Sequence, residues 1–192
     1  LKNNYEIEGI DNHFFANSFL IDDNLNNEII KKDVRDLDES YFIKFQVVIL
    51  LAGISNDPLI GTDEDLFYKP PLKYSIKVAD ICKSNGIKLI FSSSCSVYGY
   101  NKNVVNESSE TNPLTGYSKN KLEIENYITS IADNNFKPII LRFATIYGLS
   151  PRMRFDVVIN MLVGMAIIKN EVILNSNGQA SRPHLHIDDA AN

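Results

Sequence analysis

The chain has 192 residues and a formal net charge of −5, with 44% hydrophobic and 22% charged residues, a composition typical of one globular domain with a sizeable core. The negative charge argues against nucleic acid as the main partner, and no stretch reaches the ~20 apolar residues that a membrane-spanning helix needs. The two cysteines, Cys82 and Cys95, are too few for a disulfide framework, and we expect both to be reduced and buried in a cytoplasmic protein.

The chain begins with a strand-like segment. Residues 5–10 alternate between polar and apolar side chains, and the predicted strand ends at Asp11 and Asn12. An acidic residue at such a strand end binds the adenosine ribose hydroxyls in dinucleotide-binding sheets, and it repels a 2′-phosphate, so Asp11 favours NAD over NADP. Because the chain starts with Leu1 and stops at Asn192, in what reads as the first turn of a helix, we expect an internal piece of a longer protein.

A loop and two further strands are predicted next. Residues 13–27 are rich in Asn and Asp and predict a loop, and residues 28–31 predict a short strand before the charged turn Asp33-Val34-Arg35-Asp36. Residues 45–52 are nearly all apolar, which predicts a parallel strand buried on both faces. This strand leads through Leu51 into Ala52 and Gly53, where small side chains would let a ligand approach the backbone.

A helix and another buried strand are predicted in the middle of the chain. Residues 54–59 read as a loop and residues 65–85 as a helix that Pro70 and Pro71 end or kink. Asn85-Gly86 closes this helix, and residues 87–91 form the strand that delivers Ser92, Ser93 and Ser94.

The helix predicted over residues 115–134 carries Tyr117 and Lys121 four positions apart, on the face that points beyond the strand end at Ser94. A nearby ammonium favours the phenolate form of a tyrosine by roughly 1–3 pK units. Such a tyrosine can take a proton from an alcohol, while a serine hydroxyl holds the same oxygen. The hydride that leaves the alcohol carbon needs an acceptor that no side chain supplies, so a nicotinamide is implied.

The last part of the chain predicts a strand at residues 138–142, an apolar helix at 157–168 and a short strand at 171–174. His184 and His186 are two positions apart without cysteines or clustered acids, which argues against a metal pair. We expect His186 to pack or to cap a helix.

Two sequence blocks together identify a resemblance. Tyr117-Ser-Lys-Asn-Lys121 and Ser92-Ser-Ser-Cys-Ser-Val-Tyr-Gly99 resemble the Tyr-x-x-x-Lys and Ser-Ser-x-x-Val-Tyr-Gly blocks of the extended short-chain dehydrogenases/reductases, the nucleotide-sugar epimerases and dehydratases. The resemblance covers nearly the whole chain and implies an α/β fold with a Rossmann-like, doubly wound parallel sheet. It assigns residues 1–150 to an NAD-binding domain that lacks its first strand and Gly-rich loop, and residues 151–192 to the beginning of a substrate-binding part.

The resemblance also implies site residues. Tyr117 is the acid/base, Lys121 supports it and binds the nicotinamide ribose, and Ser94 holds the substrate oxygen. The cofactor-binding residues that it implies are Asp11, Asn12, Asp33, Val34, Leu51, Ala52, Gly53, Tyr117 and Lys121. The substrate-binding residues are Ser94, Thr145 and Arg182, with Arg182 as a bidentate partner of the nucleotide diphosphate.

The chain departs from the family pattern at three places. Leu50 replaces a histidine, Thr145 replaces an asparagine, and Pro71-Leu-Lys-Tyr-Ser75 replaces Asn-x-x-Gly-Thr. The change at Leu50 has no serious consequence, because the small pair Ala52 and Gly53 is kept. The change at residues 71–75 concerns local contacts near the nicotinamide, and Thr145 concerns the details of substrate binding.

Cys95 and Ser96 stand where the family's dehydratases have Asp-Glu, and neither is an acid/base suited to elimination. We therefore predict an epimerase that uses NAD and a nucleoside-diphosphate sugar for surface polysaccharide synthesis. A reductase, dehydrogenase or dehydratase of the same family remains an alternative, as does a non-catalytic dinucleotide-binding module.

Two further predictions follow from the resemblance. Because the Gly-rich loop that binds the pyrophosphate is absent, we expect these 192 residues alone to bind NAD weakly or not at all and to be inactive. The family also dimerises through a four-helix bundle, which implies a homodimer built from the helices predicted at 65–85 and 115–134.

Overall fold

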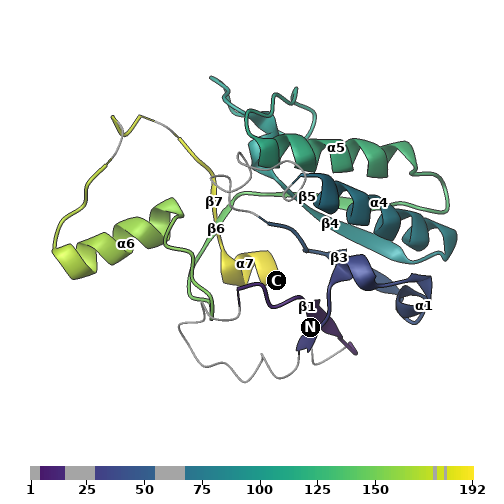
Figure 1. The fold of residues 1–192 in the computed structure, drawn as a ribbon. Helices are drawn as coiled ribbons and strands as arrows, with labels where there is room; N and C mark the ends of the chain where they lie inside the picture. Colours follow the sequence, from purple (N-terminus) through teal and green to yellow (C-terminus); the bar gives the residue numbers. More distant parts are fainter. Residues whose placement is uncertain (1–4, 16–28, 55–67, 175–176, 180) are drawn as a thin grey trace. The chain divides into compact units, whose positions relative to one another are not determined.

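The computed structural model describes residues 5–15, 29–54, 68–174, 177–179 and 181–192 (Figure 1). Its contacts divide the chain into two compact units, Lys32–Phe143 and the combination of Leu1–Lys31 with Ala144–Asn192. Within the described residues, every helix is too short or too polar to cross a membrane. The predicted domain boundary at residue 150 stays a prediction.

The unit Lys32–Phe143 is built on a three-stranded parallel sheet. Strands β3 (Val47–Leu50), β4 (Lys88–Ser94) and β5 (Ile139–Phe143) lie in the order β3-β4-β5. Helix α4 (Lys69–Ser84) connects β3 to β4, and helix α5 (Gly116–Ser130) connects β4 to β5. Two consecutive strand–helix–strand units with parallel strands make a Rossmann-like α/β fold, which confirms the predicted fold class.

Shorter elements complete this unit. The 3₁₀ helix η3 (Val34–Asp36) and the four-residue helix α1 (Glu39–Phe42) precede β3, and the 3₁₀ helix η4 (Cys95–Tyr98) follows β4 directly. Asp33 caps η3 and Ser94 caps η4, each through a side-chain oxygen that accepts a backbone N–H.

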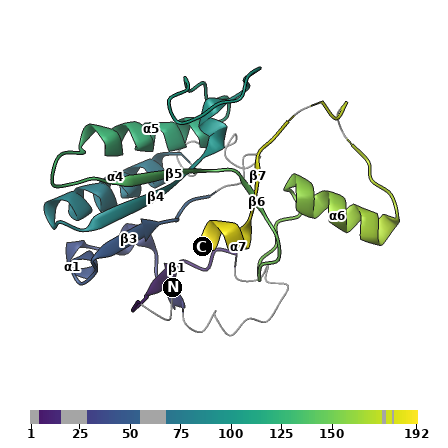
Figure 2. The ribbon, with the colours of Figure 1, turned by 180° about the vertical axis from the view of Figure 1, so that it is seen from behind.

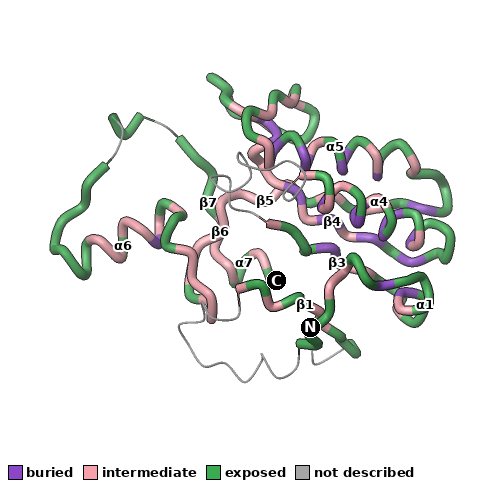
Figure 3. Tube along the Cα trace, viewed as in Figure 1, coloured by how far each residue is buried: buried purple, intermediate pink, exposed green. Residues whose placement is uncertain are grey.

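The core of the unit lies between the sheet and the two long helices, which lie side by side in both views (Figures 1 and 2). The hydrophobic side chains that are less than 2% exposed come from α4, β4, η4 and α5: Val78, Ala79, Cys82, Leu89, Phe91, Val97, Ile124 and Ile128. Figure 3 shows the buried stretches gathered along these elements. Cys82 is buried as predicted, and its burial raises the pKa of the thiol to about 12. Cys95, which was also predicted to be buried, is only half-buried.

The prediction that the strand at residues 45–52 is buried on both faces is wrong for β3, and β5 also has one exposed face. Val47 and Ile49 of β3 are 43% and 50% exposed, and Ile139 and Leu141 of β5 are 52% and 38% exposed. Both helices pack on the face that carries Leu89 and Phe91, and alternate side chains of a strand point to opposite faces. A continuous apolar run shows that both faces are apolar but not whether both are covered.

The predicted break at the prolines is also wrong. Helix α4 begins at Lys69, so Pro70 and Pro71 lie in its first turn, where a backbone N–H has no partner within the helix. Proline there costs no hydrogen bond, and α4 continues without interruption to Ser84. The predicted helix start at residues 65–67 and most of the predicted loop at 54–59 lie outside the described residues.

Helix α5 begins where its sequence predicts. Thr115 accepts a hydrogen bond from the Ser118 backbone N–H at 3.2 Å, and the Ser118 hydroxyl accepts one from the Thr115 backbone N–H at 3.0 Å. This capping box fixes the first turn, and therefore the direction in which Tyr117 leaves the helix.

The other unit contains two pairs of parallel strands. Strand β1 (Gly9–Asp11) pairs with β2 (Ile29–Lys31), and β6 (Thr145–Tyr147) pairs with β7 (His184–His186). Helix α6 (Val158–Lys169) follows β6, and the five-residue helix α7 (Ile187–Ala191) follows β7. Most of the loop predicted at residues 13–27 lies outside the described residues.

Two predictions for the end of the chain have different outcomes. His186 caps α7, because its Nδ1 accepts the Asp188 backbone N–H at 3.3 Å, so the predicted capping role is confirmed. The strand predicted at residues 171–174 is wrong, since these described residues form no ladder. A short apolar run becomes a strand only where a neighbouring strand pairs with it.

Candidate active site

A small pocket lies where strand β3 ends and helix α5 begins. Its lining comes from the segment after β3, from α4 and from α5: Ala52, Gly53, Ile54, Pro71, Ser75, Tyr117, Asn120, Lys121 and Ile124. Open parallel sheets bind their ligands beyond the carboxyl ends of their strands, and this pocket has that position. It brings together four residues that the sequence singles out: Ala52, Gly53, Tyr117 and Lys121.

Lys121 is the buried cation of this pocket, with only 7% of its surface exposed. Its Nζ donates a hydrogen bond of 2.7 Å to the backbone oxygen of Ser92, and it lies 5.7 Å from the centre of the Tyr117 ring. Burial lowers the pKa of Lys121 to about 8, and the charge of Glu125 opposes this shift. Lys121 is thus a fixed cation beside Tyr117 that titrates close to neutral pH.

Gly53 faces Lys121 across the pocket. A Cβ atom at Gly53 would lie 3.7 Å from the Lys121 Nζ and 3.8 Å from the Tyr74 hydroxyl oxygen. At Gly53 no side chain projects toward Lys121, which leaves room for a ligand to approach the backbone after β3.

Tyr74 is a residue of this region that the sequence reasoning did not assign. It is 7% exposed, and both its burial and the charge of Asp33 raise its pKa, so its hydroxyl stays neutral. The signal was present in the departure at residues 71–75, where Tyr74 replaces the glycine of the family pattern.

Ser94 is the last residue of β4. Its Oγ accepts the backbone N–H of Ser96 at 3.2 Å, which caps η4, and its side chain is half-buried. It lies two residues beyond Ser92, the residue that holds Lys121. Ser94 is thus close in sequence to Ser92, which binds Lys121, but it is not one of the residues that line the pocket.

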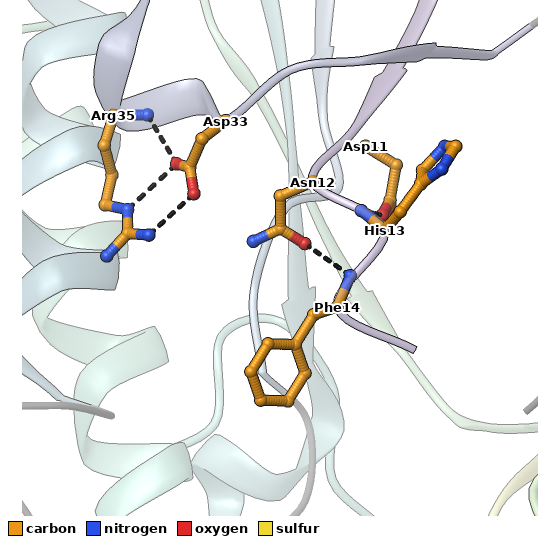
Figure 4. Close-up of polar contacts among 6 residues, drawn as sticks. All are labelled: Asp11, Asn12, His13, Phe14, Asp33 and Arg35. Atoms are coloured by element: carbon orange, nitrogen blue, oxygen red, sulfur yellow. Dashed lines mark hydrogen bonds and ion pairs between the residues drawn. The ribbon is translucent and has the colours of Figure 1, made fainter. Parts of the chain in front are cut away.

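Asp33 and Val34 lie at the start of η3, in the same unit as the pocket. The Asp33 carboxylate accepts the Arg35 backbone N–H at 2.9 Å and pairs with the Arg35 guanidinium at 2.7 Å (Figure 4). This pair raises the pKa of Arg35. Leu51, directly after β3, is 66% exposed.

The remaining site residues belong to the unit that contains both ends of the chain. Asp11 ends β1, and its carboxylate accepts the His13 backbone N–H at 2.6 Å, while the Asn12 side chain accepts that of Phe14 at 3.0 Å (Figure 4). Thr145 begins β6 and donates its backbone N–H to Pro183 at 3.2 Å. Arg182 is exposed and precedes Pro183, so Thr145 and Arg182 lie at one end of the β6–β7 pair.

Comparison with known proteins gives a family match along the chain. The model of the NAD dependent epimerase/dehydratase family matches residues 1–192. UDP-glucose 4-epimerase 1 of Oryza sativa subsp. japonica is 33% identical over 137 residues, which are 67% of this chain and 39% of that protein. The uncharacterized UDP-glucose epimerase YtcB of Bacillus subtilis is 31% identical over 115 residues, 59% of this chain and 36% of that protein.

Solved structures give the same picture. UDP-N-acetylglucosamine 4-epimerase from Methanobrevibacter ruminantium, in complex with UDP-N-acetylmuramic acid, aligns with a TM-score of 0.80 and 28% identity over 95% of this chain and 61% of that one. The chain therefore spans well under two thirds of the length of the curated relatives that it matches.

Proposed function

Because the chain belongs to the NAD-dependent epimerase/dehydratase family, we propose that the whole protein epimerises a nucleoside-diphosphate sugar through a transient keto-sugar. The observation that carries this proposal is the pocket in which Tyr117 and Lys121 stand opposite the bare backbone of Ala52 and Gly53. The similarity to UDP-sugar 4-epimerases favours a uridine nucleotide and inversion at C4 of the sugar.

The residues present fit NAD. Gly53 leaves free the space that a Cβ would fill, at 3.7 Å from the Lys121 ammonium, where the phosphates and ribose of a dinucleotide could lie against the backbone. Leu51, Ala52 and Gly53 would contact this part of NAD, and Lys121 would bind the nicotinamide ribose. When bound, NAD accepts a hydride from the sugar carbon and returns it.

The other end of NAD would be held by polar side chains. Asp33 and Val34 would contact the adenine, and Asp11 and Asn12 the adenosine ribose. The Asp11 carboxylate at the end of β1 favours NAD, because it would repel a 2′-phosphate.

Tyr117 carries the proton in the proposed reaction. As a phenolate it takes the proton of the sugar hydroxyl while the hydride leaves the same carbon, and a carbonyl forms. After the keto-sugar has turned over in the pocket, Tyr117 would give the proton back to the same oxygen as its carbon is reduced on the other face. Lys121 stabilises the phenolate by its charge, and Ser94 holds the reacting oxygen in place.

Two residues of the other unit would hold the substrate. Arg182 is suited to the diphosphate because its guanidinium can bind two phosphate oxygens at once. Thr145 would contact the sugar part. Both lie at one end of the β6–β7 pair, which would fix their spacing.

A dehydratase is a weaker candidate because Cys95 and Ser96 offer no acid/base pair for the removal of water. A reductase or dehydrogenase would consume added NADH or NAD in proportion to product, whereas an epimerase returns its cofactor unchanged. A binding module without turnover would retain NAD but form no product.

The test is product analysis with the full-length protein and a panel of nucleoside-diphosphate sugars, with and without added NAD. We expect a mixture of two epimers, formed without net change in NADH. A reduced or oxidised sugar as the sole product, or no product from any sugar of the panel, would overturn the proposal.

We also propose that the protein is a cytoplasmic homodimer that serves surface polysaccharide synthesis, with α4 and α5 at the dimer interface. The two helices are already fastened to each other within the chain, since the Tyr127 hydroxyl donates to Asp80 at 2.6 Å and the Tyr68 hydroxyl donates to Glu123 at 2.6 Å. They can therefore act as one rigid surface. The mass of the full-length protein in solution, measured by light scattering, tests this proposal.

A further inference from the structure

A buried ionic cluster lies one helical turn beyond Lys121 on α5. Its centre is Glu125, which is 3% exposed. The Glu125 carboxylate receives Arg142 of β5 through Nη2 at 2.7 Å and Nε at 3.0 Å, and it also accepts the Ser93 hydroxyl of β4. The third guanidinium nitrogen of Arg142 donates to the Tyr98 hydroxyl of η4 at 2.9 Å. Residues from four elements of one unit, α5, β4, β5 and η4, thus meet in this cluster.

Such a cluster is costly to place in a core. Burial of two charges removes their hydration, and well-packed apolar side chains often stabilise the same position better. The bidentate geometry and the additional hydrogen bonds offset this cost, but they do not explain why a charge stands there. A role for the charge in the chemistry of the neighbouring pocket would explain it.

The position of Glu125 on the helix suggests what that role is. Tyr117, Lys121 and Glu125 follow one another at intervals of four residues, so all three lie on one face of α5. Arg142 and Ser93 fix Glu125 to the sheet from two sides. This attachment fixes the α5 backbone one turn below Lys121, whose own Nζ is attached to β4 at Ser92.

The charges around Lys121 come from several elements. Tyr117 and Glu125 face it from its own helix, Tyr74 of α4 lies beside it at Gly53, and Arg142 of β5 lies behind Glu125. The negative charge of Glu125 favours the protonated form of Lys121, whereas the burial of Lys121 disfavours that form. Lys121 must stay protonated to stabilise a Tyr117 phenolate.

We propose that Glu125, held by Arg142 and Ser93, is a positioning residue that keeps Lys121 charged and aimed at Tyr117. This inference rests on the proposed function, because it assigns Glu125 to the same acid/base reaction. A purely structural Glu125 would affect stability alone, whereas a positioning residue also sets the pH range in which the enzyme works.

The test is the pH profile of kcat/KM in the full-length protein, for the wild type and the variants Glu125→Gln, Glu125→Asp and Glu123→Gln. Loss of the Lys121 proton should end the wild-type profile near pH 8, the pKa of Lys121. In Glu125→Gln we expect this alkaline limb to move to lower pH by about one unit, since the stabilising negative charge is gone. Glu125→Asp keeps the negative charge, so its alkaline limb should lie close to that of the wild type.

Glu123 is the matched control, because it lies on the same helix but is exposed, and its carboxylate accepts a hydrogen bond from the Tyr68 hydroxyl at 2.6 Å. Glu123→Gln should leave the limb unchanged. If Glu125→Gln does not fold, because Arg142 is left buried without its partner, the double variant Glu125→Gln/Arg142→Gln removes both charges. It should move the limb in the same direction by a smaller amount, since the lost positive charge of Arg142 lies behind Glu125 and opposes the effect.

The outcomes separate the two proposals. If the wild type epimerises no sugar, the proposed function fails. If the wild type is active and folded Glu125→Gln, or the folded double variant, keeps the wild-type alkaline limb, the positioning role of Glu125 is overturned while the proposed function stands.

Discussion

The Lys121 Nζ and the backbone oxygen of Ser92 lie 2.7 Å apart, so the lysine of α5 is attached to the end of β4. This hydrogen bond sets the ammonium 4.8 Å from the centre of the Phe91 ring and 5.7 Å from that of Tyr117. The lysine held in this way is only 7% exposed, so its ammonium points into the pocket and not toward solvent. It is therefore available to Tyr117 as a fixed charge, which is the arrangement that the proposed acid/base chemistry needs.

Replacement of Tyr117 tests the acid/base directly. We expect Tyr117→Phe in the full-length protein to lower kcat by about 10²–10⁴-fold, because the variant has no hydroxyl to exchange a proton with the sugar. The thermal unfolding temperature should change little. Tyr127→Phe is the control, since Tyr127 lies on the same helix and its hydroxyl donates to Asp80 instead. An active Tyr117→Phe variant, within tenfold of the wild type, contradicts the assignment.

Burial of the Lys121 charge should also reduce stability in a pH-dependent way. The pKa of Lys121 is about 8 in the folded protein against 10.5 for a free lysine. Between pH 8 and pH 10.5 the unfolded chain binds a proton that the folded chain has released, so the free energy of unfolding rises with pH in this window. Below pH 8 both states bind the proton, and burial of the charge lowers the free energy of unfolding by a constant amount of roughly 3 kcal/mol.

The variant Lys121→Met removes this cost and keeps a side chain of similar length. After loss of the Ser92 hydrogen bond, worth about 1 kcal/mol, we expect it to be more stable than the wild type by about 2 kcal/mol at pH 7. The difference should shrink as the pH rises above 8 and should reverse its sign near pH 10.5, where the cost is gone and only the loss of the hydrogen bond remains. Urea unfolding at several pH values measures it, and a variant less stable than the wild type at pH 7 would show that the buried charge costs little.

Gly99 should be required for the turn that follows the active-site strand. Its φ is +64°, and a Cβ there would lie 1.9 Å from the backbone oxygen of Asn112. Gly86 has nearly the same φ, +66°, but no described atom within 4 Å of its Cβ position. Gly86→Ala should therefore cost about 1 kcal/mol for the unfavourable φ alone. Gly99→Ala should cost clearly more in urea unfolding, and equal losses would mean that the loop at Asn112 moves away freely.

Asp11 should set the choice of cofactor. In the full-length protein we expect Asp11→Ser to reduce the preference for NAD over NADP by at least about fivefold, since repulsion of a nearby charge in water is worth ~1 kcal/mol. Asp36→Ser, a change at another exposed aspartate, is the control. Dissociation constants from fluorescence titration with both cofactors measure the effect. An unchanged preference in Asp11→Ser would assign the discrimination to other residues.

Local sequence signals predicted the elements around the site well. The start of α5 depends on Thr115 and Ser118, which are three positions apart, and the common face of Tyr117 and Lys121 depends only on helical spacing. The end of β4 at the serines likewise follows from an apolar run that changes to hydroxyls. Each of these features is fixed by residues within one or two turns of the chain.

Features that depend on distant partners were not predictable in this way. The open face of β3 and β5 depends on where both helices pack, and residues 171–174 lack a strand partner among the described residues. Tyr74 and Glu125 acquire their positions from contacts across α4, β4 and β5. A single sequence gives the chemistry of such side chains but not their neighbours.

The central claim is that one carbon of the sugar gives up a hydride and receives the same hydride back. The most direct measurement uses the full-length protein, NAD and a nucleoside-diphosphate sugar that carries deuterium at the carbon that inverts. We expect the epimer formed in ordinary water to retain the deuterium at that carbon, as read by mass spectrometry and NMR. Replacement of the deuterium by hydrogen from the solvent would mean that the carbon is deprotonated instead, and would contradict the hydride mechanism.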